Sequence, residues 1–323
     1  MKKKIFDVLD WTSLELGLRP KIVKDEARVV LPNGEKAGVI ISADFELAWA
    51  FRFSRKVSDP KKMARQARSN FPIMLELLEQ YNIPITWATV GHLMLESCKK
   101  GDHDWMTQLP YFTDDHKWNY RTGGWFDCDP YTTHLKDNAW YAPDLIESIK
   151  NSKVKHEIAC HTFSHIDFSD DNCPKEVARD EIKACIDAAK AWDIKLESMV
   201  FPGGSYGNID MLKEMGFSSY RRNLSEAKLS PVLTDLFGLK YTATSLGLGG
   251  VSLDAKSIER HKFRIRKYIQ KAKRIGMVCH LWFHPSVTPA YVNEIFPWLL
   301  SMLSEEREKG ELFIGTMSTF SKL

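Results

Sequence analysis

Five polar side chains in the sequence have types and spacings that suit hydrolytic chemistry. His161 and His165 stand four positions apart after a short apolar run, and Asp44 and Glu46 end another such run. His284 follows a third. One carboxylate and two neutral imidazoles form the ligand set of an open divalent-metal site, which leaves positions for water and a substrate oxygen. The second carboxylate could then act as a base, and the remaining histidine as an acid.

Each of these features also has an ordinary structural explanation. Two histidines four residues apart can be surface imidazoles, and Glu46 can be a solvated residue at the rim of a fold. Asp44 can cap a turn, and His284 can simply pack beside Pro285. Only the convergence of all of these side chains at one place favours a metal site over these explanations.

Strand-like and helix-like segments alternate about seven times after the turn that ends near residue 37. The expected strands are 37–45, 84–91, 155–160, 196–202, 218–223, 277–285 and 312–323. The expected helices are 59–83, 142–152, 173–194, 208–217, 259–276 and 290–310, and Pro72 predicts a break or a new first turn near Phe71 in the first of them. Such alternation predicts parallel strands, in a doubly wound sheet or in a barrel with helices outside.

The candidate polar side chains all fall at the carboxyl ends of expected strands. In parallel α/β domains the chemistry is found at that edge. The alternation of side chains along a strand also points Asp44 and Glu46 to the same side. We therefore expect these carboxylates to face His161, His165 and His284.

Composition excludes several classes of protein. The 323 residues are 44% hydrophobic and 27% charged, with a formal net charge of +3, which predicts a globular protein that does not bind nucleic acid. The basic start is not followed by a signal-peptide pattern, and no window of about 18 apolar residues occurs, so we expect a cytoplasmic protein without a membrane span. Six scattered cysteines without a CxxC pair predict reduced, buried thiols rather than disulfides or a thiolate zinc site.

Two parts of the chain stand outside the alternating pattern. Residues 1–37 are interpreted as an N-terminal extension of a domain that covers 38–323. Residues from about 99 to 141 form an insertion rich in aromatic side chains, and a loop of that length commonly forms a lid or a binding wall. Pyranose rings stack on indoles, so some tryptophans are either substrate-binding residues or plain core: Trp49, Trp125, Trp140 and Trp282.

Several stretches of the sequence resemble one known family. The stretches "GVIISADFELAW", "HEIACHTFSH", "MVFPGGSYG" and "CHLWFHP" have the order and approximate spacing of the polysaccharide deacetylases, the NodB-homology domain of carbohydrate esterase family 4. The stretch "NIPITWATVGHL" is similar to the second strand of that family. The resemblance covers about residues 38–323 and is most specific around the two paired histidines.

The resemblance implies a distorted (β/α)7-type barrel of parallel strands with helices outside and a divalent metal in its mouth. Zinc is the expected metal, before cobalt, nickel or manganese. Asp44 would be the general base, and His284 the acid that protonates the leaving amine. Glu46, His161 and His165 would hold the metal. The implied activity is removal of an N-acetyl group from an amino sugar of a glycan or glycan precursor.

Two departures from the family pattern bear on this expectation. Phe45 separates two carboxylates that are adjacent aspartates in the common motif, and the second of them here is a glutamate. Val200 stands where the family has an arginine that orients the base. We expect either that Arg221 or Arg222 reaches the base from the next strand, or that the base is held differently.

Two other functions remain open from the sequence. One is hydrolysis of a cyclic amide on the same fold, as in allantoinase, although a small ring needs no long aromatic wall. The other is a carbohydrate-binding relative without turnover, which the loss of the arginine at Val200 would suit. Assays of acetate release, of ureide opening and of carbohydrate binding without acetate release would distinguish the deacetylase from these two alternatives.

Overall fold

The computed structural model describes most of the chain. The described residues are 12–16, 18–23, 30–103, 105, 118, 124–224, 228–249 and 254–323. They include the alternating strands and helices, apart from two short gaps at residues 225–227 and 250–253. Parts of the expected N-terminal extension 1–37 and of the aromatic insertion 99–141 lie outside the described residues.

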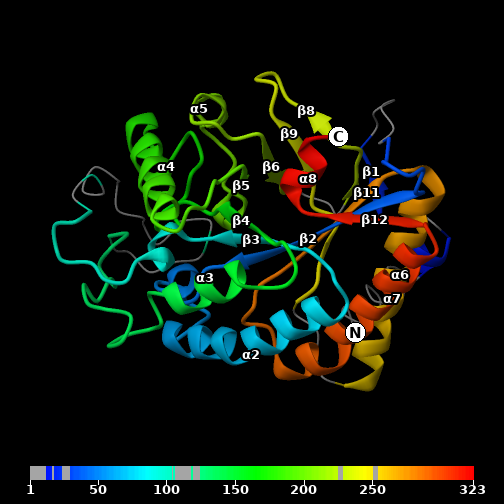
Figure 1. Ribbon diagram of the computed structural model, residues 1–323, viewed down its shortest axis with the longest axis horizontal. Helices are drawn as coiled ribbons and strands as arrows, with labels where there is room; N and C mark the ends of the chain where they lie inside the picture. The colour runs from blue at the N-terminus through cyan, green and yellow to red at the C-terminus, as the bar shows by residue number, and fades with distance from the viewer. Residues whose placement is uncertain are drawn as a thin grey trace.

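A curled, mainly parallel sheet forms the centre of the molecule (Figure 1). Its strands follow the order β10-β11-β2-β3-β4-β5-β6-β9-β8, and β12 pairs with the first half of β2. The bounds are β2 Ala37–Phe45, β3 Thr86–Thr89, β4 Glu157–Cys160, β5 Ser198–Val200, β6 Ser219–Arg222, β8 Leu233–Thr234, β9 Lys240–Ala243, β10 Leu246–Gly247, β11 Val278–Phe283 and β12 Leu312–Gly315. Only the pairing of β8 with β9 is antiparallel among the described strands of this sheet.

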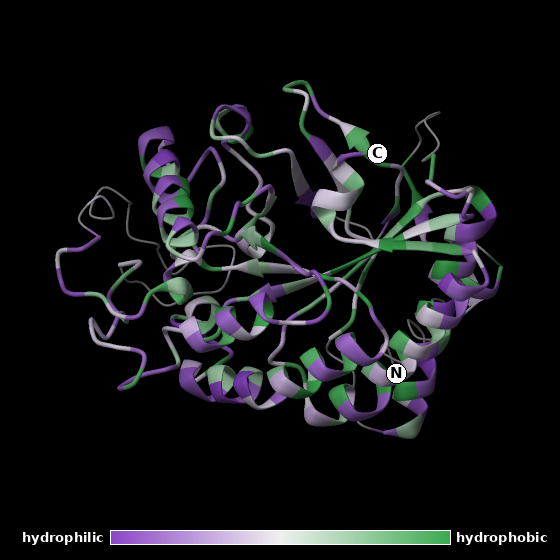
Figure 2. Ribbon diagram, in the orientation of Figure 1, coloured by the Kyte–Doolittle hydropathy of each residue, from purple (hydrophilic) through white to green (hydrophobic). Residues whose placement is uncertain are grey.

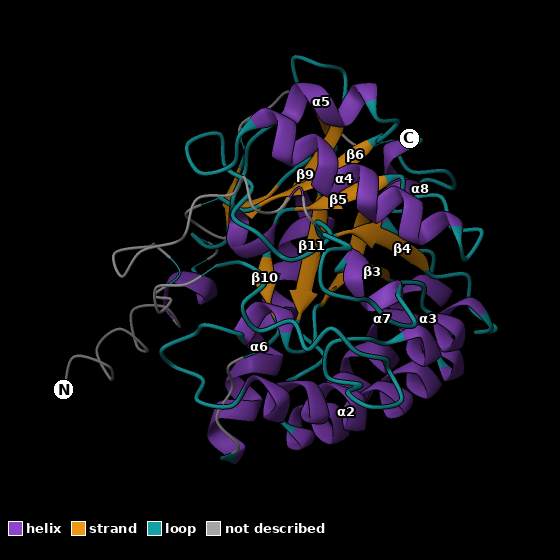
Figure 3. Cartoon of the chain, turned by 90° about the vertical axis from the view of Figure 1, so that its left-hand side faces the viewer, coloured by secondary structure: helices purple, strands orange, loops and turns teal. Residues whose placement is uncertain are grey.

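Helices cover the outside of the curled sheet, with α2 and α4 on opposite sides of the strands (Figures 1 and 3). The α-helices are α2 Pro60–Gln80, α3 Pro143–Lys150, α4 Lys175–Lys190, α5 Ile209–Glu214, α6 Ala255–Ile275, α7 Phe296–Glu308 and α8 Met317–Ser321. Short helical turns are η1 Trp49–Phe51, η2 Gly91–Met94, η4 Pro202–Gly204 and the π-helical η5 Tyr291–Ile295. Hydrophilic residues line the outer faces of α2 and α4 (Figure 2), as expected for helices that pack on a core.

The distorted barrel predicted from the sequence is confirmed, as a half-barrel of parallel strands with helices outside. The edge strands β10 and β8 are not paired with each other within the described part of the sheet. Strand β2 lies at the centre, and all nine of its residues are buried, as expected for a strand covered on both faces. This burial places Asp44 and the residues beside it in the interior of the barrel.

Two local expectations about the fold are wrong. Pro72 does not break the helix, because α2 runs unbroken from Pro60 to Gln80. Phe71 and Met74 on either side of the proline are buried, and their packing outweighs the hydrogen bond that the proline removes. The last expected strand ends at Gly315, since the Thr316 side chain accepts the Thr319 N–H and caps α8.

The N-terminal segment contributes one strand to a small second sheet. Strand β1, Lys21–Ile22, pairs in parallel with β7, Lys228–Leu229. The domain boundary between residues 37 and 38 stays a prediction. None of the described helices has the length and apolar character needed to cross a bilayer.

Candidate metal and catalytic site

The carboxyl ends of three parallel strands bring the candidate side chains together. Asp44 is the penultimate residue of β2, and Glu46 follows that strand directly. His161 follows β4, and His284 follows β11. Because these strands run in parallel within one sheet, their carboxyl ends meet at the same edge, as the sequence predicts.

The Glu46 carboxylate lies directly opposite two imidazoles. Its Oε2 is 3.3 Å from Nε2 of His161 and 3.1 Å from Nε2 of His165. One ligand atom from each of the three residues lies within 4.8 Å of the other two, and all three side chains are buried. The longer glutamate side chain therefore reaches the paired histidines in spite of the altered spacing of the first motif.

The orientation of the His161 ring is fixed by the main chain of the neighbouring strand. Its Nδ1 lies 2.7 Å from the carbonyl oxygen of Val200. A carbonyl oxygen only accepts hydrogen bonds, so Nδ1 must carry the proton and donate it. In the neutral ring, Nε2 then presents its lone pair toward Glu46, which is the tautomer that a metal ligand requires.

These three residues fit a bound cation. Burial acts to raise the pKa of Glu46, but the imidazoles of His284, His161 and His165 hold it well below its usual range, so the carboxylate is ionised. Burial lowers the pKa of His165 to about 4, so this ring is neutral at neutral pH. A cation between the anionic oxygen and the two imidazole nitrogens would satisfy all three buried ligand atoms.

A buried glutamate of helix α4 supports the loop between the two histidines. Thr162 and His165 have positive φ angles of 56° and 54°, which non-glycine residues rarely adopt. Glu181 accepts the backbone N–H groups of Phe163 and Ser164 at 3.0 and 3.1 Å. Burial raises the pKa of Glu181 to about 7. The hydrogen bonds of Glu181 therefore help to hold the strained loop in place.

Arg221 on strand β6 binds the Asp44 carboxylate with two hydrogen bonds. Its Nη1 and Nη2 donate to Oδ1 at 2.5 Å and to Oδ2 at 2.7 Å. Burial acts to raise the pKa of Asp44, but the Arg221 guanidinium holds it below its usual value. The arginine absent at Val200 thus has a spatial substitute from the next strand, whereas the Arg222 guanidinium lies 4.6 Å over the ring of Tyr206.

His280 completes a buried hydrogen-bonded chain behind Asp44. Arg221 Nη1 also donates to Ser42 Oγ at 2.9 Å, and Ser42 Oγ lies 2.9 Å from Nε2 of His280. The other ring nitrogen of His280 is 2.8 Å from Thr242 Oγ1. Burial, with Arg221 nearby, lowers the pKa of His280 well below its usual value, so the ring is neutral. His280 thus lies in the interior of β11 and supports the partners of Asp44.

His284 faces both carboxylates from the open side of the cluster. Its Nε2 lies 3.2 Å from Glu46 Oε1 and 4.0 Å from Asp44 Oδ2. Its side chain is 38% exposed, compared with 7% or less for both carboxylates. A molecule that enters from solvent therefore meets His284 at the entrance to the site.

The four tryptophans singled out from the sequence differ in how much surface they keep. Trp49, Trp140 and Trp125 are buried, with 0%, 3% and 5% of their surface exposed, and the first two pack edge to face with centroids 5.3 Å apart. Trp282 is partly exposed, and its ring centroid lies 5.4 Å from that of His284. Of the four, Trp282 is the one with free surface beside the site.

Trp118 is a neighbour of the site that the sequence reasoning missed as a candidate. Its ring centroid lies 5.5 Å from that of His165. A Cβ atom on Gly203 would come within 2.4 Å of the Trp118 indole, so the glycine allows this close approach. The glycine pair at 203 and 204 was the available signal, since it permits a bulky group to lie against the backbone.

Part of the chain matches a protein-family model. Residues 63–219 match the model described as polysaccharide deacetylase. The matched span contains His161 and His165, whereas Asp44, Glu46 and His284 lie outside it. A comparison with curated proteins finds no match to the chain.

Several solved structures share the fold over nearly the whole chain. One described as a polysaccharide deacetylase from Mycobacterium smegmatis has a TM-score of 0.63 at 15% identity, over 93% of this chain and 94% of that one. One from Pseudomonas aeruginosa PAO1, with the same description, has a TM-score of 0.61 at 9% identity and the same coverage. A structure of Puue allantoinase has a TM-score of 0.58 at 9% identity, over 93% of each chain. At these identities the likeness establishes a shared fold.

Proposed function

Because the chain belongs to the polysaccharide deacetylase family as a divergent member, we propose that it is a metal-dependent hydrolase that removes an N-acetyl group from an amino sugar of a glycan or glycan precursor. The observation that carries the proposal is the meeting of Asp44, held by Arg221, with Glu46 and three histidines at one edge of the sheet. Membership of the family supports hydrolysis of acetylated carbohydrates in general.

Glu46, His161 and His165 would hold the metal. Their facing ligand atoms and the hydrogen bond from His161 to the Val200 carbonyl support this assignment. Zinc suits a set of two imidazoles and one carboxylate, and cobalt, nickel or manganese are the alternatives. When bound, a divalent ion in such a site polarises an acyl carbonyl and lowers the pKa of water toward 7 or so.

Asp44 and His284 would move the protons of the reaction. The ionised Asp44 carboxylate accepts a proton from the water that attacks the acetamide carbonyl, and Arg221 keeps that carboxylate in one orientation. His284 donates a proton to the amide nitrogen as the C–N bond breaks, so that the products are acetate and a free amine. Its exposed position at the entrance suits contact with the leaving group.

Trp282 is the proposed wall for the sugar ring. It is partly exposed and adjoins His284, and the Arg221 guanidinium lies over its ring at 5.2 Å from the centroid. An indole offers a flat apolar face on which a pyranose can stack. The burial of Trp49, Trp125 and Trp140 supports a packing role for them instead.

The test measures acetate released from a panel of N-acetylated saccharides, with mass spectrometry to detect the loss of about 42 mass units from the product. The full chain is loaded with zinc or cobalt and compared with Asp44→Asn and His284→Gln variants. His134→Ala is the matched control, because His134 is a partly buried histidine paired with Glu96 away from the site. Release of acetate by wild type and the control, but not by Asp44→Asn, is the expected result.

Two other results would overturn the proposal. Opening of ureides without acetate release would indicate a cyclic-amide hydrolase on the same fold. Tight binding of oligosaccharides without turnover, even with added metal, would indicate a carbohydrate-binding relative.

A further inference from the structure

A second buried cluster of potential metal ligands lies in the aromatic insertion and the segment before it. His92 belongs to η2, Cys98 and His103 follow it, and Asp129 comes from the far end of the insertion. One ligand atom from each of the four lies within 4.8 Å of the other three. The exposed fractions are 0%, 4%, 7% and 7% in chain order, so all four side chains are buried, and Cys98 and His103 also line a neighbouring cavity.

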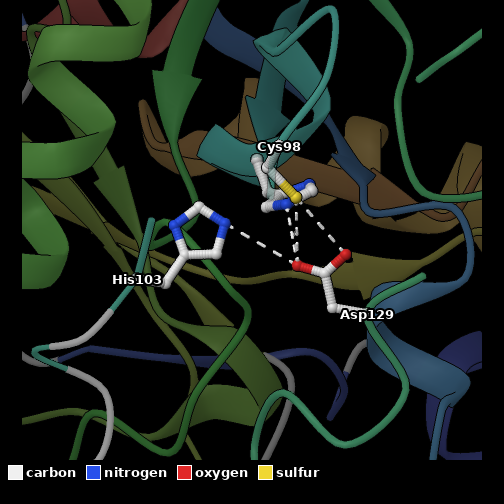
Figure 4. Close-up of side chains that lie close together, drawn as sticks. Cys98, His103 and Asp129 are labelled. Atoms are coloured by element: carbon white, nitrogen blue, oxygen red, sulfur yellow. Dashed lines mark hydrogen bonds and ion pairs between the residues drawn. The ribbon is translucent and has the colours of Figure 1, made fainter. Parts of the chain in front are cut away.

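The three distances from Asp129 to the other ligand atoms of this cluster are close to those of a tetrahedral metal site. Oδ2 of Asp129 lies 3.2 Å from Nε2 of His92, 3.7 Å from Nε2 of His103 and 3.4 Å from Sγ of Cys98. Bonds of about 2.0 to 2.3 Å from zinc to N, O and S ligands place tetrahedral ligand atoms roughly 3.3 to 3.8 Å apart. Figure 4 shows the side chains of Cys98 and His103 directed at the Asp129 carboxylate.

The hydrogen bonds around the cluster direct one ligand atom of His92 and one of Asp129 inward, and the Cys98 sulfur lies between the Asp129 carboxylate and the Tyr141 hydroxyl. Nδ1 of His92 lies 3.2 Å from the carbonyl oxygen of Trp140 and must donate to it, so Nε2 is the free nitrogen of the neutral ring. Asp129 Oδ1 accepts the backbone N–H of Tyr131 at 3.0 Å, which leaves Oδ2 toward the cluster. Metal-binding histidines and carboxylates typically use one atom for a hydrogen bond to the surrounding protein and direct the other atom at the metal.

Three imidazole nitrogens in the cluster are buried without a hydrogen bond to any described residue: Nε2 of His92 and both ring nitrogens of His103. The two Nε2 atoms face the Asp129 carboxylate at 3.2 and 3.7 Å. Buried polar atoms of this kind are costly unless a ligand satisfies them. A dication would satisfy both Nε2 atoms, and a thiolate and a carboxylate would neutralise its charge.

We propose that His92, Cys98, His103 and Asp129 bind one zinc ion in a closed structural site. A thiolate, two imidazoles and a carboxylate supply all four ligands, so no position remains for a substrate. The ring of Phe163, on the loop between His161 and His165, lies 5.5 Å from His92 and 5.2 Å from His103. The second metal therefore anchors the insertion behind the loop that carries the paired histidines.

The experiment counts metals in the full chain, purified without a histidine tag and saturated with zinc. We expect about two zinc ions per chain by elemental analysis, and about one after Cys98→Ser. Replacement of zinc by cobalt should give a thiolate-to-cobalt charge-transfer band in wild type, which Cys98→Ser abolishes. His161→Ala should lose the other metal and keep the band.

The matched control is Cys128→Ser, since Cys128 is a partly buried cysteine of the same insertion outside the cluster. It should keep both metals and the band. A wild type that binds no more than about one zinc ion per chain and shows no thiolate band overturns the proposal, even if Cys98→Ser does not fold. One ion with the band supports this site and contradicts the metal dependence proposed above, so the two failures are distinguishable.

Discussion

Two clusters of ligand-type side chains adjoin the loop from His161 to His165 and differ in the exposure of their surroundings. The cluster of Glu46, His161 and His165 has three ligands and opens toward His284, which is 38% exposed. The cluster around His92 has four ligands, none more than 7% exposed. We call them the open cluster and the closed cluster.

In both clusters, a hydrogen bond to a backbone carbonyl orients a histidine. Nδ1 of His161 donates to the Val200 carbonyl, and Nδ1 of His92 donates to the Trp140 carbonyl. The ligand types therefore do not distinguish catalysis from structure. A catalytic site is distinguished from a structural one by the number of its protein ligands and by their burial, because only an open coordination position admits water and substrate.

The largest expected effect is a difference between two histidine substitutions. His161→Ala should lower turnover on the order of 10³-fold or more, because in the proposed reaction the open cluster would supply the electrostatic stabilisation. His103→Ala should keep turnover within about threefold at low temperature and lower the melting temperature instead. Acetate release and thermal unfolding monitored by circular dichroism check both expectations.

His134→Ala should change neither quantity, since His134 pairs with Glu96 outside both clusters. If folded His103→Ala protein is as inactive as His161→Ala, the two clusters do not differ in function as proposed.

Removal of Arg221 should affect both activity and stability. Arg221→Ala leaves the Asp44 carboxylate buried at 5% exposure without its cation. Breaking such a pair costs about 3 to 5 kcal/mol of unfolding free energy, and loss of the oriented base should lower turnover about 10²-fold. Urea unfolding and steady-state kinetics measure the two effects.

The double variant Arg221→Ala with Asp44→Ala should regain part of the stability and none of the activity. Arg179→Ala is the control, because its guanidinium pairs with Glu214 on an exposed face. Full activity of Arg221→Ala would show that the proposed role of Asp44 as a base does not depend on the hydrogen bonds from Arg221.

Loss of one ligand from the closed cluster should appear as a loss of stability that depends on zinc. Asp129→Asn should lower the unfolding free energy by about 2 to 3 kcal/mol with zinc present, because binding energy at a structural site contributes to folding. A strong chelator should lower wild type to the level of the variant. Urea unfolding with and without the chelator measures this.

Asp187→Asn, on an exposed turn of α4, is the control and should respond to the chelator as wild type does. A wild type whose stability is indifferent to the chelator would mean that the closed cluster holds no structural metal.

The smallest expected effect concerns Glu181, which supports the loop from His161 to His165. Burial raises its folded pKa to about 7 from 4.5, so the folded state binds this proton more tightly than the unfolded chain does. The resulting stabilisation is complete below about pH 4.5 and is lost as the pH rises through 7, with a slope of up to about 1 kcal/mol per pH unit. Glu181→Gln mimics the protonated side chain and should remove this slope.

Urea unfolding of both proteins at several pH values between those limits measures the slope. Equal slopes for wild type and Glu181→Gln would show that Glu181 does not titrate in this range.

Much of the fold could be predicted from local patterns in the sequence. The strand Ala37–Phe45 has the predicted bounds, because a run of nine buried residues between turn signals leaves few alternatives. The continuity of α2 through Pro72 could not be predicted, since it depends on what Phe71 and Met74 contact in the folded chain. The strands β7, β8 and β10 were missed because two residues each are too few to show a period, and β9 was missed as well.

The sequence by itself determined the succession of the main strands along the chain, the types of the candidate ligands and their place at strand ends. Those properties follow from hydrophobic runs and from the rule that parallel strands end at one edge. It thereby placed Asp44, Glu46, His161, His165 and His284 at the same edge of the sheet.

The tertiary structure alone decided which distant residues meet. Strands β3, β4 and β5 lie between β2 and β6, so only the curl of the sheet brings Arg221 against Asp44. The closed cluster likewise brings His92 together with Asp129 from the far end of the insertion, and the sequence has no CxxC pair that would predict it. Contacts between residues far apart in the chain depend on the summed packing of the whole domain, and no local pattern encodes them.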